Sequence, residues 1–164
     1  MRSWKRSVLL GCLAALALVL AYVESFIVWP FGIPGIRLGL PNLVIVFVLY
    51  RFGGREAACV SLVRVVAVAL LFGNAMAFWY SLGGAALSLG GMVLLRRTKL
   101  ASATVSAVGG ALHSVGQIAV ALLVTRTVGV AWYLPVLLVT GVAAGVIIGL
   151  AAAWLVRRVP QWNM

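Results

Sequence analysis

The chain has 164 residues, of which 65% are hydrophobic and 9% are charged, and its mean hydropathy is +1.19. Soluble domains are roughly 45–50% apolar and about 25% charged, so this composition excludes a water-soluble protein. In a soluble protein, the net charge of +11 would suggest nucleic-acid binding. Here the basic residues stand in short clusters between apolar segments, as topology signals do, and we expect no nucleic-acid partner.

Six apolar segments follow one another, joined by short turns with Pro, Gly or basic residues. The first could mimic a secretory signal, because basic residues precede it and Leu9–Cys12 resembles a lipoprotein cleavage box. Too few apolar residues precede Cys12 for a signal core of about 7–15 residues, so we expect an uncleaved helix. The second is short and contains Pro41, which predicts a tilted or partly re-entrant span. The expected all-α integral membrane domain covers residues 1–164, with spans at 7–28, 38–52, 56–73, 77–95, 101–125 and 131–156.

Basic residues gather at alternate ends of these segments. By the positive-inside rule, this pattern places both termini in the cytoplasm. Aromatic residues that suit an outer interface lie near the opposite loops. The basic residues concerned are Arg2, Lys5, Arg6, Arg51, Arg55, Arg96, Arg97, Lys99, Arg157 and Arg158.

Small residues form stripes on three segments, and such stripes let membrane helices approach closely. They have two interpretations, packing within the bundle or docking onto another membrane subunit. On the last segment they are Gly141, Gly145, Gly149 and Ala153, and on the fourth they are Gly83, Gly84, Gly90 and Gly91. On the first segment, the candidate docking residues are Gly11, Ala14, Ala15, Ala17 and Ala21.

Strongly polar side chains concentrate in the half of the bundle expected to face outward. A pore or proton pathway would need polar groups at every depth, so this distribution predicts a cavity open outside and closed below. Charged groups at mid-membrane cost roughly 2.5–3.5 kcal/mol on insertion scales and usually mark functional sites. The candidate substrate-binding residues are Glu24, Arg37, Asn42, Arg64, Asn74, Tyr80, His113 and Gln117.

One intramembrane carboxylate, Glu24, stands against two guanidinium groups, on Arg37 and Arg64. The positive surplus favours an anionic ligand group, such as a carboxylate or a phosphate. The alternatives are a structural ion pair between Glu24 and Arg64, and an Arg37 side chain that reaches the lipid headgroups. His113 and Gln117 share one helix face and either contact the ligand or pack internally. Asn42 and Asn74 bond either ligand or neighbouring backbone.

The chain contains no Asp, and its only acids are Glu24 and Glu56. Magnesium-dependent diphosphate chemistry requires clustered carboxylates, so we expect no enzymatic activity from this chain alone. No phosphate-binding GxxxxGK[ST] loop is present, so ATP hydrolysis is not expected either. A single His and two separated Cys residues do not predict a metal site, and we expect no cofactor.

These ordered motifs resemble the Gx transporter family, which is often labelled heptaprenyl diphosphate synthase component I. That family is related to the substrate-binding S components of energy-coupling factor (ECF) transporters. The sequence departs from the family pattern at Ser114, where Asn is commoner, and at Pro41, where a small residue is commoner. The similar segments are Glu24–Ile27, Ile33–Asn42, Arg64, Phe72–Asn74, Tyr80–Gly84, His113–Gln117 and Tyr133–Val136.

The resemblance implies an S-component-like bundle of six helices in the bacterial plasma membrane, with both termini inside. It implies a binding subunit that captures a small anionic vitamin or precursor from outside, with a first helix that docks on a T component above two ATPase subunits. The alternative is a non-catalytic membrane accessory subunit in prenyl-diphosphate or quinone biosynthesis. The missing aspartates argue against reading the synthase label as catalysis by this chain.

Overall fold

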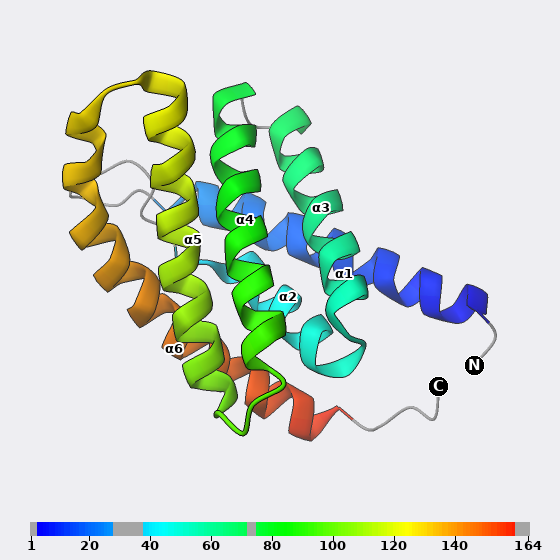
Figure 1. Ribbon diagram of the computed structural model, residues 1–164. Coiled ribbons are helices and arrows are strands. Elements are labelled where there is room, and N and C mark those ends of the chain that lie inside the picture. Colours follow the sequence, from blue (N-terminus) through cyan, green and yellow to red (C-terminus); the bar gives the residue numbers. More distant parts are fainter. Residues whose placement is uncertain (1–2, 28–37, 72–74, 160–164) are drawn as a thin grey trace.

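The computed structural model describes residues 3–27, 38–71 and 75–159. Most residues in these ranges are helical and none of them forms a strand, which confirms the expected all-α fold (Figure 1). The helices are α1 (Ser3–Ser25), α2 (Leu40–Arg51), α3 (Gly54–Leu71), α4 (Ala75–Leu95), α5 (Ser102–Thr125), the 3-10 helix η1 (Val128–Tyr133) and α6 (Leu134–Arg158).

Four of the described segments are long and apolar enough to cross a membrane, as expected of a multi-pass membrane protein. They are Trp4–Ser25, Ala75–Leu95, Ser102–Thr125 and Val128–Arg158. The helix α3 has 18 residues but carries charges at Arg55, Glu56 and Arg64. Six complete crossings therefore remain a prediction.

The short second helix begins inside the bundle. Its 12 residues are about 18 Å long at 1.5 Å per residue, whereas the hydrocarbon layer is about 30 Å thick. Pro41 lies in its first turn, where a missing N–H costs nothing, so this proline starts the helix and does not kink it. The N-terminus of α2 lies beside Ile148, partway along α6.

The helices fall into two halves along the chain, α1–α3 and α4–α6, which we call the N-terminal half and the C-terminal half. Within the C-terminal half, α5 packs along both α4 and α6 (Figure 1). Within the N-terminal half, α1 packs against α2 and α3. The halves meet where α3 contacts α4 and where α2 contacts α6.

Glycines bring the helices of the C-terminal half into close contact. A Cβ at Gly110 of α5 would overlap the backbone of Gly141 of α6, and one at Gly116 would overlap the backbone of Gly83 of α4. A Cβ at Gly149 would lie 2.6 Å from the Cα of Ala103. The stripe on the last helix therefore packs inside the bundle.

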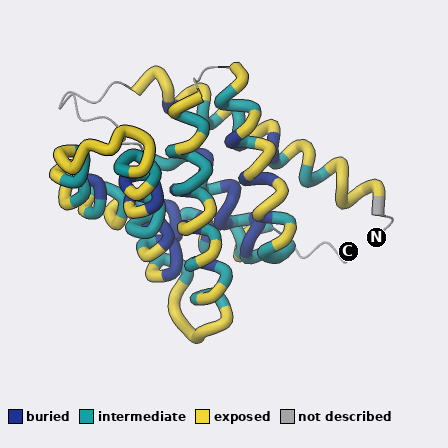
Figure 2. The backbone as a smooth tube through the Cα atoms, turned by 45° about the horizontal axis from the view of Figure 1, so that its top comes forward, coloured by how far each residue is buried: buried dark blue, intermediate teal, exposed yellow. Residues whose placement is uncertain are grey.

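The apolar core lies toward one end of the bundle, which we call the basic end, where α1, α3 and α5 begin and α2, α4 and α6 end. Arg51 Nη2 donates a hydrogen bond to the carbonyl of Val159 over 2.9 Å at this end, and Arg96 lies over the ring of Tyr50. Figure 2 shows the buried residues where the helices meet, while much of α1 is exposed. The core includes Ala14, Ala17, Val44, Ile45, Val46, Val48, Leu49, Ala57, Val60, Met92, Val105, Ile148 and Ala152.

Candidate functional site

A cavity of about 400 Å³ lies between the two halves. This volume is within the range of about 300–1,000 Å³ that is usual for small-molecule sites. Val46, Met92 and Ile148 line the cavity and also belong to the apolar core, so they form its floor toward the basic end. The cavity wall on the side away from the basic end carries most of the strongly polar side chains that the sequence analysis predicted to bind substrate.

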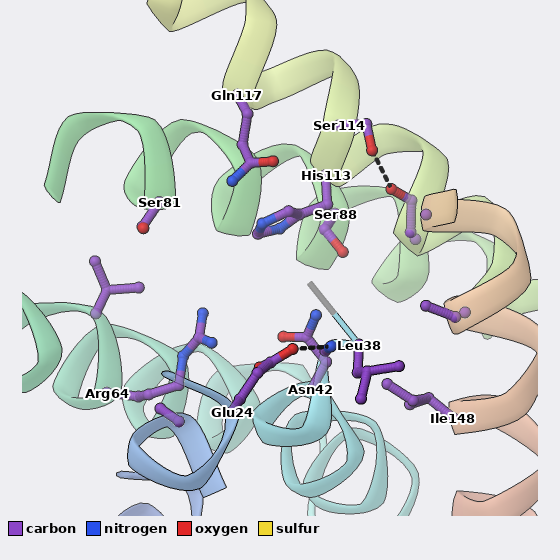
Figure 3. A pocket seen from close by; sticks show the side chains of 18 of the residues that line it. Glu24, Leu38, Asn42, Arg64, Ser81, Ser88, His113, Ser114, Gln117 and Ile148 are labelled. Atoms are coloured by element: carbon purple, nitrogen blue, oxygen red, sulfur yellow. Dashed lines mark hydrogen bonds between the residues drawn. The ribbon is translucent and has the colours of Figure 1, made fainter. Parts of the chain in front are cut away.

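Glu24 is buried at the C-terminal end of α1, with 8% of its surface exposed. Its Oε1 accepts a hydrogen bond of 2.6 Å from the backbone N–H of Gly39, the residue that caps the N-terminus of α2 (Figure 3). A carboxylate at this position is stabilised by the unpaired N–H groups and the positive end of the helix dipole. Glu24 therefore fixes the start of α2 at the edge of the cavity.

Gly39 makes this arrangement possible because its backbone is left-handed, with a φ of 76°. A side chain there would be strained, and its Cβ would also lie 3.1 Å from Cδ1 of Ile148. The backbone N–H of Asn42 donates to the carbonyl of Gly39 over 2.8 Å and closes the first turn. The amide of Asn42 is thereby held beside Glu24 on the cavity wall (Figure 3).

The C-terminal half contributes an imidazole and an amide. His113 and Gln117 lie one turn apart on α5 and face Glu24, Asn42 and Arg64 across the cavity (Figure 3). Both side chains pass over Gly84 of α4, where a Cβ would be 2.9 Å from Cε1 of His113 and 3.0 Å from Cγ of Gln117. The absence of a side chain at position 84 thus leaves the space that these two groups occupy.

Five serines also line the cavity, namely Ser25, Ser81, Ser88, Ser106 and Ser114. Ser114 Oγ donates a hydrogen bond of 2.7 Å to the carbonyl of Leu137 and so joins α5 to α6 (Figure 3). Ser88 and Ser106 are buried. Sequence analysis did not select Ser106 or the backbone of Gly39. The signal for Gly39 was a glycine two residues before a proline, which often marks the start of a helix.

The structure brings together five of the eight predicted site residues. They are Glu24, Asn42, Arg64, His113 and Gln117. Tyr80 does not line the cavity, although the next residue, Ser81, does. Arg37 and Asn74 lie outside the described residues.

The five residues predicted to dock a partner do not share one exposed face. Gly11 and Ala15 are exposed, whereas Ala14 and Ala17 are buried inside the bundle. Ala21 is half-buried and lines the cavity. An external partner could therefore contact only part of this stripe in the described conformation.

The chemistry of the cavity suits binding of a polar or charged group. It offers a guanidinium, a carboxylate, an imidazole, two amides and several hydroxyls. Within residues 3–27, 38–71 and 75–159, no three His, Cys, Asp or Glu side chains lie close enough to hold a metal ion. The groups present can position a ligand by charge and hydrogen bonds.

The sequence model of the family described as heptaprenyl diphosphate synthase component I matches residues 13–155, which is most of the chain. No curated protein and no solved structure matches the chain. The matched range includes every residue described above as lining the cavity.

Proposed function

Because the chain belongs to the heptaprenyl diphosphate synthase component I family, we propose that it works as a membrane subunit that binds a ligand and does not transform it. The ligand is a small anionic vitamin or precursor, captured from the outer side of a bacterial plasma membrane. Transport is driven by partners, an ECF-type T component and its ATPase subunits.

The observation that carries this proposal is the contrast between the two ends of the bundle. Polar side chains from both halves meet in a cavity, while the basic end below it is filled by apolar side chains. A continuous channel would not have such a floor. A cavity closed toward the basic end supports capture of a ligand from the opposite side.

An anionic ligand is supported by the guanidinium of Arg64 on the cavity wall. The carboxylate of Glu24 already accepts a hydrogen bond from the N-terminus of α2. Arg64 presents a guanidinium in the same cavity, and guanidinium groups bind carboxylates and phosphates in a bidentate manner. His113 and Gln117 face it from α5 and supply further hydrogen-bond donors.

A second candidate function is supported by the family description itself, which names a synthase component. In this role the protein would be a non-catalytic accessory subunit that presents a lipid substrate or anchors a prenyl diphosphate synthase. Catalysis by this chain alone is disfavoured because it has two acidic residues in total, Glu24 and Glu56. Magnesium-dependent diphosphate chemistry uses several carboxylates together.

Ligand capture is tested by a thermal-shift screen of the purified protein with vitamins, flavins, prenyl phosphates and quinone precursors. A ligand that binds the folded state raises the melting temperature. We expect His113→Ala and Arg64→Gln to remove the shift caused by a hit. Arg97→Gln, which removes an exposed charge outside the cavity, should keep it. An unchanged shift in both cavity variants would exclude them from the site.

The two functions differ in their partners. Co-purification in mild detergent with a T component and ATPase subunits is expected if the protein is part of an importer. Recovery of a prenyl diphosphate synthase without these subunits would contradict the importer and support the accessory role. A known S component purified in parallel shows that the conditions preserve such complexes.

A further inference from the structure

A second hollow, which we call the α1–α3 groove, lies between the first and third helices and has a volume of about 380 Å³. From α1 it is lined by Leu10, Gly11 and Ala15, among others, and from α3 by Cys59, Val63 and Ala67. These side chains are small or apolar. The lining of α1 runs from Leu10 to Leu18, which is a length of about 12 Å along the helix.

The groove and the polar cavity share one lining residue. Arg64 lines both hollows, and it is the one charged residue among those that line the groove. On the groove side its neighbours are apolar, whereas on the cavity side they include Glu24 and Asn42. A molecule that extended past Arg64 would therefore pass from a polar site into an apolar one.

The groove lies on the apolar surface of the bundle. Val63, which lines it, is 54% exposed, and the neighbouring Leu62 is 53% exposed. In a membrane protein such residues face lipid tails, because apolar side chains meet no penalty there. The groove is thus open to molecules that are dissolved in the bilayer.

We propose that the ligand is a single-chain amphiphile, whose anionic head lies in the cavity beside Arg64 and whose apolar chain lies in the α1–α3 groove. This inference rests on the proposed function as a binding subunit and specifies its class of ligand. The guanidinium of Arg64, which lines both hollows, pairs with the head. The chain replaces bilayer lipid in the groove and is held by van der Waals contact with small residues.

A chain fits this groove better than a helix of a partner subunit does. Packed helices have axes 8–10 Å apart, as a general rule, and an α-helix with side chains is about 10–12 Å in diameter. Because α1 and α3 already contact each other, a third helix could lie only across the groove and would not reach the cavity. A hydrocarbon chain is narrow enough to enter between the side chains.

The test compares inorganic phosphate, butyl phosphate and decyl phosphate, with binding measured by thermal shift and calorimetry in nanodiscs. Affinities for the two esters are corrected for their partitioning into protein-free nanodiscs, and that for inorganic phosphate is taken from its aqueous concentration. Wild-type protein should bind decyl phosphate most tightly. Gly11→Leu places a side chain in the groove, and a Cβ at Gly11 meets no atom within 4 Å, so the fold should be retained. We expect this variant to lose about tenfold in affinity for decyl phosphate and nothing for butyl phosphate.

Gly90→Leu is the matched control, because a Cβ at Gly90 also meets no atom within 4 Å and this residue of α4 lines neither hollow. Gly90→Leu should change the affinity for neither butyl phosphate nor decyl phosphate. Arg64→Gln should weaken binding of both esters. Equal affinity for the two esters in the wild type, or an equal response of both to Gly11→Leu, would overturn the amphiphile while leaving anion capture intact. If none of the three phosphates binds, both the capture of phosphate anions and the proposed amphiphilic ligand are contradicted.

A second measurement uses the two cysteines of the wild-type chain, which are both free and exposed. Cys59 lines the groove and Cys12 does not. Saturating decyl phosphate should slow the labelling of Cys59 by a maleimide and leave that of Cys12 unchanged. Equal labelling rates with and without decyl phosphate would overturn the proposal even if Gly11→Leu failed to fold. Gly11→Leu could also abolish co-purification of a T component while decyl phosphate binding stays unchanged. That result would show that a partner subunit occupies the groove, and it would overturn the proposed amphiphile as well.

Discussion

The two halves of the bundle are held together in different ways. In the C-terminal half, α4, α5 and α6 meet through glycines at which an added Cβ would strike neighbouring backbone, as at Gly110, Gly116 and Gly149. In the N-terminal half, α1 is largely exposed, α2 has 12 residues, and an apolar groove separates parts of α1 and α3. Close backbone contact between membrane helices maximises van der Waals attraction, so the C-terminal half is expected to be the more rigid.

The two halves contribute different groups to the cavity. The rigid half presents His113 and Gln117 at fixed positions on α5, packed against Gly84. The looser half carries the charged groups, Glu24 and Arg64, and the short helix α2. A ligand that pairs with both halves would stabilise mainly the N-terminal half, because that half has more freedom to lose.

The largest effect is expected from a side chain at the α5–α6 crossing. Gly110→Leu would force Cβ into the backbone of Gly141, which cannot move without separating the two helices. We expect a loss of about 3 kcal/mol or more, seen as a failure to purify monodisperse protein. Gly90→Leu adds the same side chain where no atom lies within 4 Å and should be harmless. Equal behaviour of the two variants would contradict the tight backbone contact between α5 and α6, on which the comparison of the halves rests.

A smaller loss is expected at the start of α2. Gly39→Ala would place a Cβ at a φ of 76° and 3.1 Å from Cδ1 of Ile148. The left-handed conformation costs a non-glycine residue about 1–2 kcal/mol, and the melting temperature should fall accordingly. Gly11→Ala, at an open position, is the control. If Gly39→Ala melted like the wild type, α2 would not depend on this turn.

Hydropathy and charge predicted the helices well, because a membrane requires long apolar segments whose ends are marked by basic residues. The helix α5, for example, was expected at 101–125 and is observed at Ser102–Thr125. The second segment was expected at 38–52, but α2 covers only Leu40–Arg51. The shortness of this segment and Pro41 had predicted a tilted or partly re-entrant span, whereas apolar composition alone does not show where along its neighbours a helix begins.

The site was predicted less completely, since residue type does not show in which direction a side chain points. Glu24 was expected to bind ligand or to pair with Arg64, and both stay predictions. The structure adds a hydrogen bond to its carboxylate from the backbone N–H of Gly39, which no side-chain pattern reveals. Among the small residues of the first helix, Ala14 and Ala17 are buried while Gly11 and Ala15 are exposed. This difference depends on where α1 crosses α2 and α3, which is a tertiary property.

Glu24→Gln separates the negative charge of Glu24 from its hydrogen bond to Gly39. The amide oxygen can still accept from the N–H of Gly39, but the negative charge at the N-terminus of α2 is removed. We expect a loss of about 1 kcal/mol, because a charge at a partly buried helix terminus contributes about that much. Glu24→Ala should lose more, since it also leaves the N–H of Gly39 without its acceptor. Equal melting of the two variants would show that the hydrogen bond contributes nothing.

The smallest effect is expected at the basic end, where Arg6 of α1 and Glu56 of α3 form an ion pair of 2.5 Å. Their side chains are 46% and 22% exposed, so water and salt weaken the attraction. Exposed pairs contribute about 0.2–1 kcal/mol, and a double-mutant cycle with Arg6→Gln and Glu56→Gln should return a coupling at the low end of that range. The coupling should decrease further in high salt. A coupling well above this range would mean that this ion pair holds α1 against α3. The N-terminal half would then be joined more tightly than its packing indicates.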